Sequence, residues 1–480
     1  MADKMSAGGG MGVFGRRRRV SFQAFVSSAL ALAILAFLCA LSARNGHAAM
    51  HPAPASRVEE DLRGEHLGVA SCASSTCHGR QEPTGAIVRQ DEVARWQDET
   101  SAAGAHSRAW RVLGQARAQA IAERLGIGDP QRSAQCLSCH ADPAPVHAAG
   151  FRIADGVGCE ACHGGGARWI ASHAATSATH ARNVAAGMVP LDDPQARAAV
   201  CLDCHLGSDA PGQFVDHRIM AAGHPRLSFE LDLFSTLEQH WNEDADYVAR
   251  KGRPSPVRFW AIGQADALVR ALTVYSGPRG SEGAFPEFAF FDCHTCHRRI
   301  GDEAGFRPSA LANPGRPIAI GMPAFQDENI IMLSAAARVL APEQAARFDG
   351  DARAFHAALG QGRPQAIGAA ARLRTSAAAL AAGFAQHRFD RGETLAILHA
   401  VAVGAAARYT DYQASVQAVM AIDTLLSALV KQGAIQVRQA AAIRADIDHA
   451  YRAVHDPNDY HALDFRAALS HAADAVRGIA

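Results

Sequence analysis

Five short segments of the chain contain two cysteines followed directly by a histidine. Four of them have two residues between the cysteines: Cys136–His140, Cys159–His163, Cys201–His205 and Cys293–His297. The fifth, Cys72–His78, has four residues between its cysteines. With this content of cysteine and histidine, chance would produce on the order of one hundredth of a Cys-x-x-Cys-His segment per chain. The repetition therefore indicates that the five segments have the same chemical role.

A Cys-x-x-Cys-His segment is the attachment signature of c-type haem. The two thiols add across the two vinyl groups of one haem, and the histidine that follows reaches the iron from the same side. Zinc ribbons and disulfides are the alternatives, because paired cysteines also bind zinc. A zinc site does not require a histidine after the second cysteine of every pair, so haem is favoured. In the longer segment, Cys72–His78, the chain must bulge to place both thiols.

The sequence therefore predicts about five covalently bound haem c groups. The predicted attachment residues are Cys72, Cys77, Cys136, Cys139, Cys159, Cys162, Cys201, Cys204, Cys293 and Cys296. The predicted proximal iron ligands are His78, His140, His163, His205 and His297. Only Cys39, which lies in an apolar N-terminal stretch, falls outside these segments.

Each iron needs a second ligand from elsewhere in the fold, and an iron without one would be open to a substrate. Enough non-motif histidines lie between residues 63 and 301 to close all five irons. We predict four distal ligands: His106, His173, His217 and His224. The less favoured candidates are His66, His147, His180 and His240, and the methionines Met188 and Met220 are not favoured. The histidines of the C-terminal segment, from His356 to His471, are expected to face solvent.

The N-terminus has the pattern of a targeting segment. Four arginines at positions 16–19 precede a stretch, residues 22–41, that is almost entirely apolar, and small residues follow up to Ala49. This is typical of a secretory signal peptide or of an uncleaved membrane anchor. The apolar stretch, at roughly 20 residues, is long enough to span a bilayer. Cleavage is favoured, and both alternatives predict a periplasmic, exported protein that an uncleaved segment would anchor to the membrane.

Charge limits the classes of partner. Residues 1–49 carry five more positive than negative charges, so residues 50–480 carry about five more negative than positive charges. Haem propionates would add to this negative charge. An acidic protein of this kind is not expected to bind nucleic acid, and redox partner proteins, including membrane-bound ones, are the expected partners.

The expected fold class is mainly α. We predict three parts: the signal or anchor (residues 1–49), a loop-rich multihaem cytochrome c domain with packed haems (50–312), and a haem-free α-helical domain (313–480). Residues 50–63 are expected to be a flexible lead-in, and residues 90–126 have helical periodicity. Ser255 and Pro256 predict a helix start, and the Gly277-Pro278 pair its end. In the C-terminal domain we predict these helices: Asn329–Leu340, Pro364–Ala382, Glu393–Arg408, Asp411–Lys431, Ala434–Val454 and Tyr460–Arg477.

Four sequence elements together resemble a known family. They are Cys-x4-Cys-His-Gly at Cys72, His-Ser-Arg-Ala-Trp at His106, Cys-Leu-x-Cys-His at Cys136, and Gly-Val-x-Cys-Glu-x-Cys-His-Gly at Gly156. The chain is similar, over about Gly68–Arg226, to the periplasmic tetrahaem cytochrome c of the ammonia-oxidation pathway and its multihaem relatives. The resemblance implies a mainly α fold around tightly packed haem pairs, an electron-transfer role, and His106 as a distal ligand. The fifth motif and the helical C-terminal segment lie outside the tetrahaem pattern.

Two functions remain open at this stage, with a third less favoured. The first is electron transfer through haems whose irons are all closed by two ligands. The second is an oxidoreductase in which one open, five-coordinate haem acts on a small nitrogen or sulfur compound. The chain has no Cys-x-x-Cys-Lys segment, so the lysine-ligated haem of pentahaem nitrite reductases is not expected. A sensor or scaffold whose helical segment docks a partner is the third.

Overall fold

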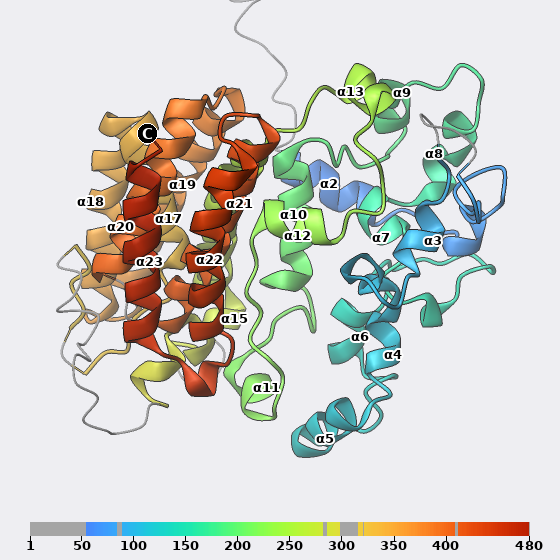
Figure 1. The fold of residues 1–480 in the computed structure, drawn as a ribbon. Coiled ribbons are helices and arrows are strands. Elements are labelled where there is room, and N and C mark those ends of the chain that lie inside the picture. Colours follow the sequence, from blue (N-terminus) through green and yellow to red (C-terminus); the bar gives the residue numbers. More distant parts are fainter. Residues whose placement is uncertain are drawn as a thin grey trace, which may run out of the picture. The chain divides into compact units, whose positions relative to one another are not determined.

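The computed structural model describes residues 54–83, 89–281, 286–297, 315–319, 321–408 and 411–479. These residues belong to one unit, Pro54–Ala480. Figure 1 shows helices joined by loops, and the only β contacts among the described residues are two isolated bridges, His66–His147 and Phe291–Phe325. The expected mainly α fold is confirmed. The predicted signal or anchor, Cys39 and the predicted boundary at residue 312 lie outside the described residues.

Short helices and loops carry four of the five Cys–His segments. In chain order the elements are α2 (Pro54–Leu62), η1 (Val69–Ser71), α3 (Glu92–Trp96), η2 (Ala102–Gly104), η3 (His106–Arg108), α4 (Ala109–Val112), α5 (Ala116–Leu125), α6 (Ala134–His140), η4 (Ile153–Asp155), α7 (Glu160–His163), α8 (Gly166–His173), α9 (His180–Ala185), α10 (Pro194–His205), α11 (His217–Ala221), α12 (Leu231–Leu237) and α13 (Ala245–Lys251). The helical periodicity of residues 90–126 therefore corresponds to several short pieces, of which α5 is the longest.

The expected flexible lead-in is wrong for residues 54–62, which form helix α2. Proline is tolerated in the first turn of a helix, so Pro54 does not prevent helix formation there. The side chain of Val58 is buried in a small apolar cluster with Val189, Ala196 and Val200. Helix α2 therefore packs against α10, and this tertiary burial gives the segment a structure that its composition did not predict.

Helix α14 (Pro256–Ser276) confirms the helix predicted between Ser255 and Gly277. The Ser255 side chain accepts a hydrogen bond from the backbone N–H of Arg258, which satisfies one of the unpaired donors of the first turn. Most of the helix is buried, because it contacts α10 and α12 on the haem-motif side and α17, α19 and α21 on the other. Helix α14 therefore joins the two halves of the described structure.

The C-terminal helices lie side by side (Figure 1). They are α17 (Glu328–Leu340), α18 (Pro342–Leu359), α19 (Arg363–Gln386), α20 (Arg391–Arg408), α21 (Tyr412–Lys431), α22 (Val437–Ala453) and α23 (Ala462–Arg477), with η7 (Pro457–Asp459) before the last. Each predicted helix is present with small shifts at its ends, and α18 was not predicted. Helix α21 is long and apolar enough to cross a membrane, but 78% of its apolar window is buried among the other helices.

Between α14 and α17 the chain contributes three further short elements: α15 (Pro278–Ser281), η5 (Phe288–Phe290) and η6 (Cys293–Thr295). The bridge between Phe291 and Phe325 pairs the segment before the fifth motif with the segment before α17. His294, inside the fifth motif, lies 2.5 Å (Nε2) from the Pro457 carbonyl oxygen of η7. The fifth motif is therefore held against the C-terminal helices.

Apolar burial is distributed unevenly. One large core runs through α14 and the C-terminal helices, from Val257 to Val476. Among the described residues on the other side, the apolar clusters are small, such as the one formed by Ala198, Leu202, Leu231, Phe259 and Ala267. A region of this length normally needs a continuous apolar core. Small apolar clusters are expected if large apolar cofactors fill the centre of the region that carries the first four Cys–His segments.

A buried carboxylate, Glu160, fastens the third motif to the segment before the first. Its two oxygens accept hydrogen bonds from the backbone N–H groups of Leu67 (2.8 Å), Gly68 (2.7 Å) and Gly166 (2.6 Å). The side chain is only 3% exposed, so these donors have little access to water.

We expect Glu160→Gln to lower the free energy of unfolding by about 1–3 kcal/mol. The NH2 group of the new amide would face a buried backbone N–H group, and it cannot accept a hydrogen bond from that group. Chemical denaturation of the haem-loaded protein measures this loss. Glu99→Gln, at an exposed site, is the control and should change little. Equal stability of the two variants would contradict the proposed role of Glu160.

Candidate haem-binding site

The Cys–His segments adopt one local geometry. In the third motif the backbone N–H of His163 donates to the carbonyl of Cys159 at 2.9 Å, and in the fifth the N–H of His297 donates to the carbonyl of Cys293 at 2.8 Å. The second and fourth motifs lie within helices α6 and α10, which end at their histidines. One helical turn thus brings both thiols and the histidine together, as haem attachment requires. All ten motif thiols are unbridged.

The longer first motif keeps the same closing contact. The backbone N–H of His78 donates to the carbonyl of Cys72 at 3.1 Å, although two more residues lie between them than in the other motifs. The extra residues form a local turn, in which the N–H of Cys77 donates to the carbonyl of Ser74 at 2.9 Å. The expected bulge is therefore present, and it leaves the ends of the motif arranged as in the shorter motifs.

We expect the double variant Cys72→Ala/Cys77→Ala to lose one haem per chain, because both covalent bonds to that haem would be removed. Haem quantification by pyridine haemochrome, divided by protein concentration, measures the loss. The control is the unmodified protein prepared in the same way, which should keep the full haem content. An unchanged ratio in the double variant would mean that Cys72 and Cys77 serve another purpose.

Each motif histidine faces one histidine from elsewhere in the chain. The distances between ring centroids are 5.9 Å for His78–His173, 6.3 Å for His140–His224, 6.4 Å for His163–His240, 6.2 Å for His205–His106 and 6.1 Å for His297–His217. We number these pairs 1 to 5 in the chain order of their motif histidines. All four predicted distal residues, His106, His173, His217 and His224, lie opposite a motif histidine.

The separation within each pair fits one metal ion between two imidazoles. A metal–imidazole bond is about 2 Å long and the ring centroid lies about 1 Å behind the nitrogen, so two rings on opposite sides of an ion have centroids about 6 Å apart. Aromatic rings in direct contact spread over about 4.5–7 Å. The five pairs all fall between 5.9 and 6.4 Å. The residues present therefore fit haem iron held by two histidines.

Hydrogen bonding at the far side of the rings separates these histidines from the others. Five of the ten have a hydrogen-bond acceptor near Nδ1: Glu92 at 3.0 Å from His78, the Ala109 carbonyl at 2.9 Å from His140, the Pro225 carbonyl at 2.7 Å from His224, and Glu238 near His106 and His240. His173 differs, because the amide Nδ2 of Asn183, a donor, lies 3.2 Å from its Nδ1. A partner at Nδ1 leaves Nε2 for a metal and fixes the ring orientation. These contacts therefore orient five of the paired histidines as ligands.

His66 and His147 form a further pair of rings, 6.3 Å apart, but their nitrogens are used differently. His66 is 1% exposed and contacts Asp142 through Nδ1 (2.9 Å) and the Leu62 carbonyl through Nε2 (3.1 Å). His147 lies 3.5 Å from Asp142 through Nε2. This pair is a carboxylate-bridged packing contact.

Other histidines also contact carboxylates through Nε2, among them His180 and His356. His180 lies 2.8 Å from Asp192. His356 lies 3.4 Å from Asp327 and is buried. The expectation that His356 faces solvent is therefore wrong, because α18, the helix that carries it, packs into the C-terminal core.

His240 is the paired histidine that sequence reasoning did not favour. It follows α12 in a loop, and neither a motif nor a fixed spacing marks it. The neighbouring Trp241 packs edge-on against its ring, and the Arg197 guanidinium lies 5.1 Å from the centre of the Trp241 ring. These contacts fix the loop opposite His163, so only the fold reveals the pairing.

Burial keeps two motif imidazoles, those of His163 and His205, neutral. It lowers the pKa of His163 to about 3 and the pKa of His205 to about 4. A neutral imidazole is the form that binds a metal. Burial alone would raise the pKa of Glu238, but hydrogen bonds with His106 and His240 lower it to about 2. Glu238 is therefore ionised at neutral pH.

Contacts between the motifs give the order of the five pairs. The side chains of Cys72 and Cys159 are in contact, which places pair 1 beside pair 3. The side chains of Cys139 and Cys204 are in contact, which places pair 2 beside pair 4.

Shared elements connect the remaining neighbours. Glu238 contacts a histidine of pair 3 and one of pair 4. Helix α11 and the turn after it carry both His217 of pair 5 and His224 of pair 2. The neighbours thus follow the order 1, 3, 4, 2, 5.

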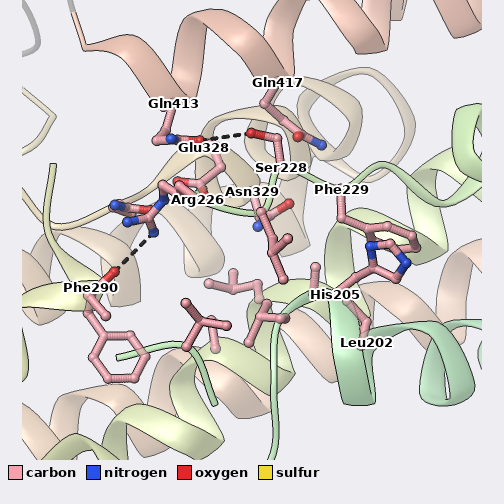
Figure 2. Close-up of a pocket in the computed structure, with 18 of the residues that line it drawn as sticks. Leu202, His205, Arg226, Ser228, Phe229, Phe290, Glu328, Asn329, Gln413 and Gln417 are labelled. Atoms are coloured by element: carbon pink, nitrogen blue, oxygen red, sulfur yellow. Dashed lines mark hydrogen bonds between the residues drawn. The ribbon is translucent and has the colours of Figure 1, made fainter. Parts of the chain in front are cut away.

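A cavity of about 100 Å³ lies beside His205 (Figure 2). Its wall includes Arg226, Glu328 and Gln417, and within the described part of the chain each has a buried nitrogen or oxygen without a hydrogen-bond partner. Burial raises the pKa of Glu328 to about 7. Polar groups around a space of this size are typically satisfied by ordered water. Figure 2 also shows Ser228 donating to Gln413 of α21 at 3.2 Å, a contact between the motif region and the C-terminal helices.

Comparison with known proteins identifies the region that contains the first three motifs. A family model described as cytochrome c554 and c-prime matches residues 71–164. The match supports a c-type cytochrome with covalently bound haem c and a role in electron transfer. It includes the complete first, second and third motifs and His106. No curated protein and no solved structure matches the chain.

Proposed function

We propose that the chain is an exported multihaem cytochrome c that carries electrons through about five covalently bound haems. The five histidine pairs are the observation that carries this proposal. Haem iron held by two imidazoles exchanges electrons and leaves no coordination position for a substrate. The thiols of each motif would hold the haem covalently, and the backbone contact from histidine to the first cysteine would fix both in one turn.

The order of the pairs supports a linear path for electrons. Pairs 1 and 5 are its two ends, and pairs 3, 4 and 2 lie between them. The first end lies in the Cys72–His78 region, and the other lies where His294 contacts the C-terminal helices. We propose that redox partner proteins exchange electrons at these two ends, and that the C-terminal helices cover the fifth haem.

Location and partner class are proposed from the sequence. The arginine-rich and apolar residues 16–41 support export to the periplasm, where the segment would either be removed or retained as a membrane anchor. The excess of acidic residues after position 49 favours basic surfaces on the partner. Membrane-bound partners fit this location.

The alternative, an oxidoreductase acting on a small nitrogen or sulfur compound, needs one open iron. Pair 2 is one place where the structure favours it. His224 follows Gly223, whose φ is 111°, and its Nδ1 contacts only the carbonyl of the next residue, Pro225, among the described residues. A ligand held by so local a contact leaves more easily than one held by a residue distant in sequence.

Carbon monoxide added to the fully reduced protein tests the proposal. It binds ferrous haem only at a free coordination position, so a closed carrier should show no change in its Soret band. Coulometric titration of the same sample should record about five electrons per chain. A carbon monoxide adduct in the untreated protein would favour the enzyme, and the variant His224→Ala provides a positive control for an open iron.

A further inference from the structure

One carboxylate, Glu238, lies between two of the histidine pairs. It is the residue at the C-terminal end of α12. Its Oε2 lies 2.8 Å from Nδ1 of His106, and its Oε1 lies 3.5 Å from Nδ1 of His240. The backbone carbonyl of Glu238 also lies 3.1 Å from Nδ1 of His240. His106 faces His205 and His240 faces His163, so a single residue contacts the distal histidines of pairs 4 and 3.

The acceptors at the other pairs differ in charge. At pair 2, both Nδ1 atoms face backbone carbonyls, of Ala109 and Pro225, which are neutral. At pair 1, His78 faces the carboxylate of Glu92 at 3.0 Å. Glu92 therefore serves one pair, whereas Glu238 serves two.

A carboxylate that accepts the Nδ1 hydrogen makes the imidazole a stronger electron donor through Nε2. Stronger donation stabilises ferric over ferrous iron and lowers the reduction potential, since potentials of haem depend on hydrogen bonds to the ligands. A neutral carbonyl has a weaker effect, because hydrogen bonds to charged groups are stronger.

We propose that Glu238 is a positioning residue that orients His106 and His240 together and lowers the reduction potentials of the haems at pairs 3 and 4 as a unit. The inference rests on the proposed function, because it requires haem at both pairs. It adds a specific consequence. The reduction potentials of two adjacent haems in the middle of the path depend on the same residue, Glu238, so a change at that residue should alter both potentials.

The test compares Glu238→Gln with Glu92→Gln in the full-length, haem-loaded protein. Both changes remove one negative charge and keep a similar shape. Spectroelectrochemical titration should resolve two components shifted to more positive potential in Glu238→Gln. The shift should be larger at pair 4, where the carboxylate lies 2.8 Å from His106, than at pair 3, where the carboxylate lies 3.5 Å from His240 and the backbone carbonyl remains as the hydrogen-bond acceptor. Glu92→Gln should show one shifted component. The low-temperature EPR g values of the same number of ferric haems should change, and all haems should stay low-spin.

A third variant, Glu238→Asp, keeps the charge on a shorter side chain that cannot reach both rings. It should shift one component, and it replaces Glu238→Gln if that variant loads haem poorly. The proposal would be overturned if the reduction potential of only one component, or of none, shifted in Glu238→Gln. An equal shift in the potentials of all components would also overturn it, because such a shift indicates a change in the overall charge of the protein. Haem content and spin state of the unmodified protein test the proposed function separately, so its failure is distinguishable from that of Glu238.

Discussion

We expect the variant His240→Ala to contain one high-spin ferric haem in place of a low-spin haem, with the total haem content unchanged. The covalent bonds through Cys159 and Cys162 and the proximal ligand His163 would remain, so the haem would stay in place. The iron would lose the imidazole that lies 6.4 Å from His163 between ring centroids. Low-temperature EPR of the oxidised protein measures the change, which should involve about one fifth of the haem.

The matched control is His147→Ala. His147 also lies about one ligand-pair distance from another histidine, 6.3 Å from His66, but its Nε2 faces Asp142. The control should keep every haem low-spin. A high-spin signal in His147→Ala, or none in His240→Ala, would contradict the assignment of the third pair. Added imidazole should restore the low-spin spectrum of His240→Ala, because it can occupy the vacated position.

The second large effect concerns Arg316, which is 2% exposed. Its Nε lies 2.7 Å from Asp327, its Nη1 lies 2.9 Å from Asp411, and its Nη2 donates to the Phe325 carbonyl at 2.6 Å. Both aspartates are buried. Arg316→Met would leave two carboxylates in the core without their cation, and removing one partner of a buried ion pair costs about 3–5 kcal/mol. We expect a loss of this size in the free energy of unfolding.

Arg338→Met is the comparison for that loss. Arg338 lies 2.8 Å from Asp349 but is 55% exposed, so its ion pair is screened by water. Such exposed pairs contribute less than about 1 kcal/mol. Urea denaturation followed by far-ultraviolet circular dichroism reports on the C-terminal helices that Arg316 joins. Similar midpoints for the two variants would mean that the buried ion pairs do not hold these helices together.

The sequence allowed much of the helical structure to be predicted, because caps and periodicity are local. Ser255 and Pro256 began a helix where expected, and Asp411 caps α21 by accepting from the backbone N–H of Ala414. Helix α18 was missed although Pro342 stands at its first position, because its N-cap residue, Ala341, provides no side-chain hydrogen bond to strengthen the signal. Helix α2 was missed because it is stabilised by tertiary contacts, such as the burial of Val58 against residues of α10, which the sequence does not reveal.

In the candidate site, too, the features with a local sequence signal were predictable and those that depend on tertiary contacts were not. The Cys–His segments are local in sequence, so their attachment chemistry follows directly from spacing. A distal ligand is chosen by the fold, and His240 lies far along the chain from His163. His217 and His224 were predictable in part, because Gly223 and Pro225 mark a turn that presents a side chain. Glu238 had no sequence signal, since its importance comes from contact with two histidines that are distant from each other in sequence.

The central claim is that all five Cys–His segments carry haem and that each iron is closed by the histidine opposite. Pyridine haemochrome quantification of the purified, exported protein, read with low-temperature EPR of its oxidised form, tests both parts in one sample. The account predicts five haems per chain, all low-spin. Four haems or fewer, or a high-spin signal that persists between preparations, would contradict it.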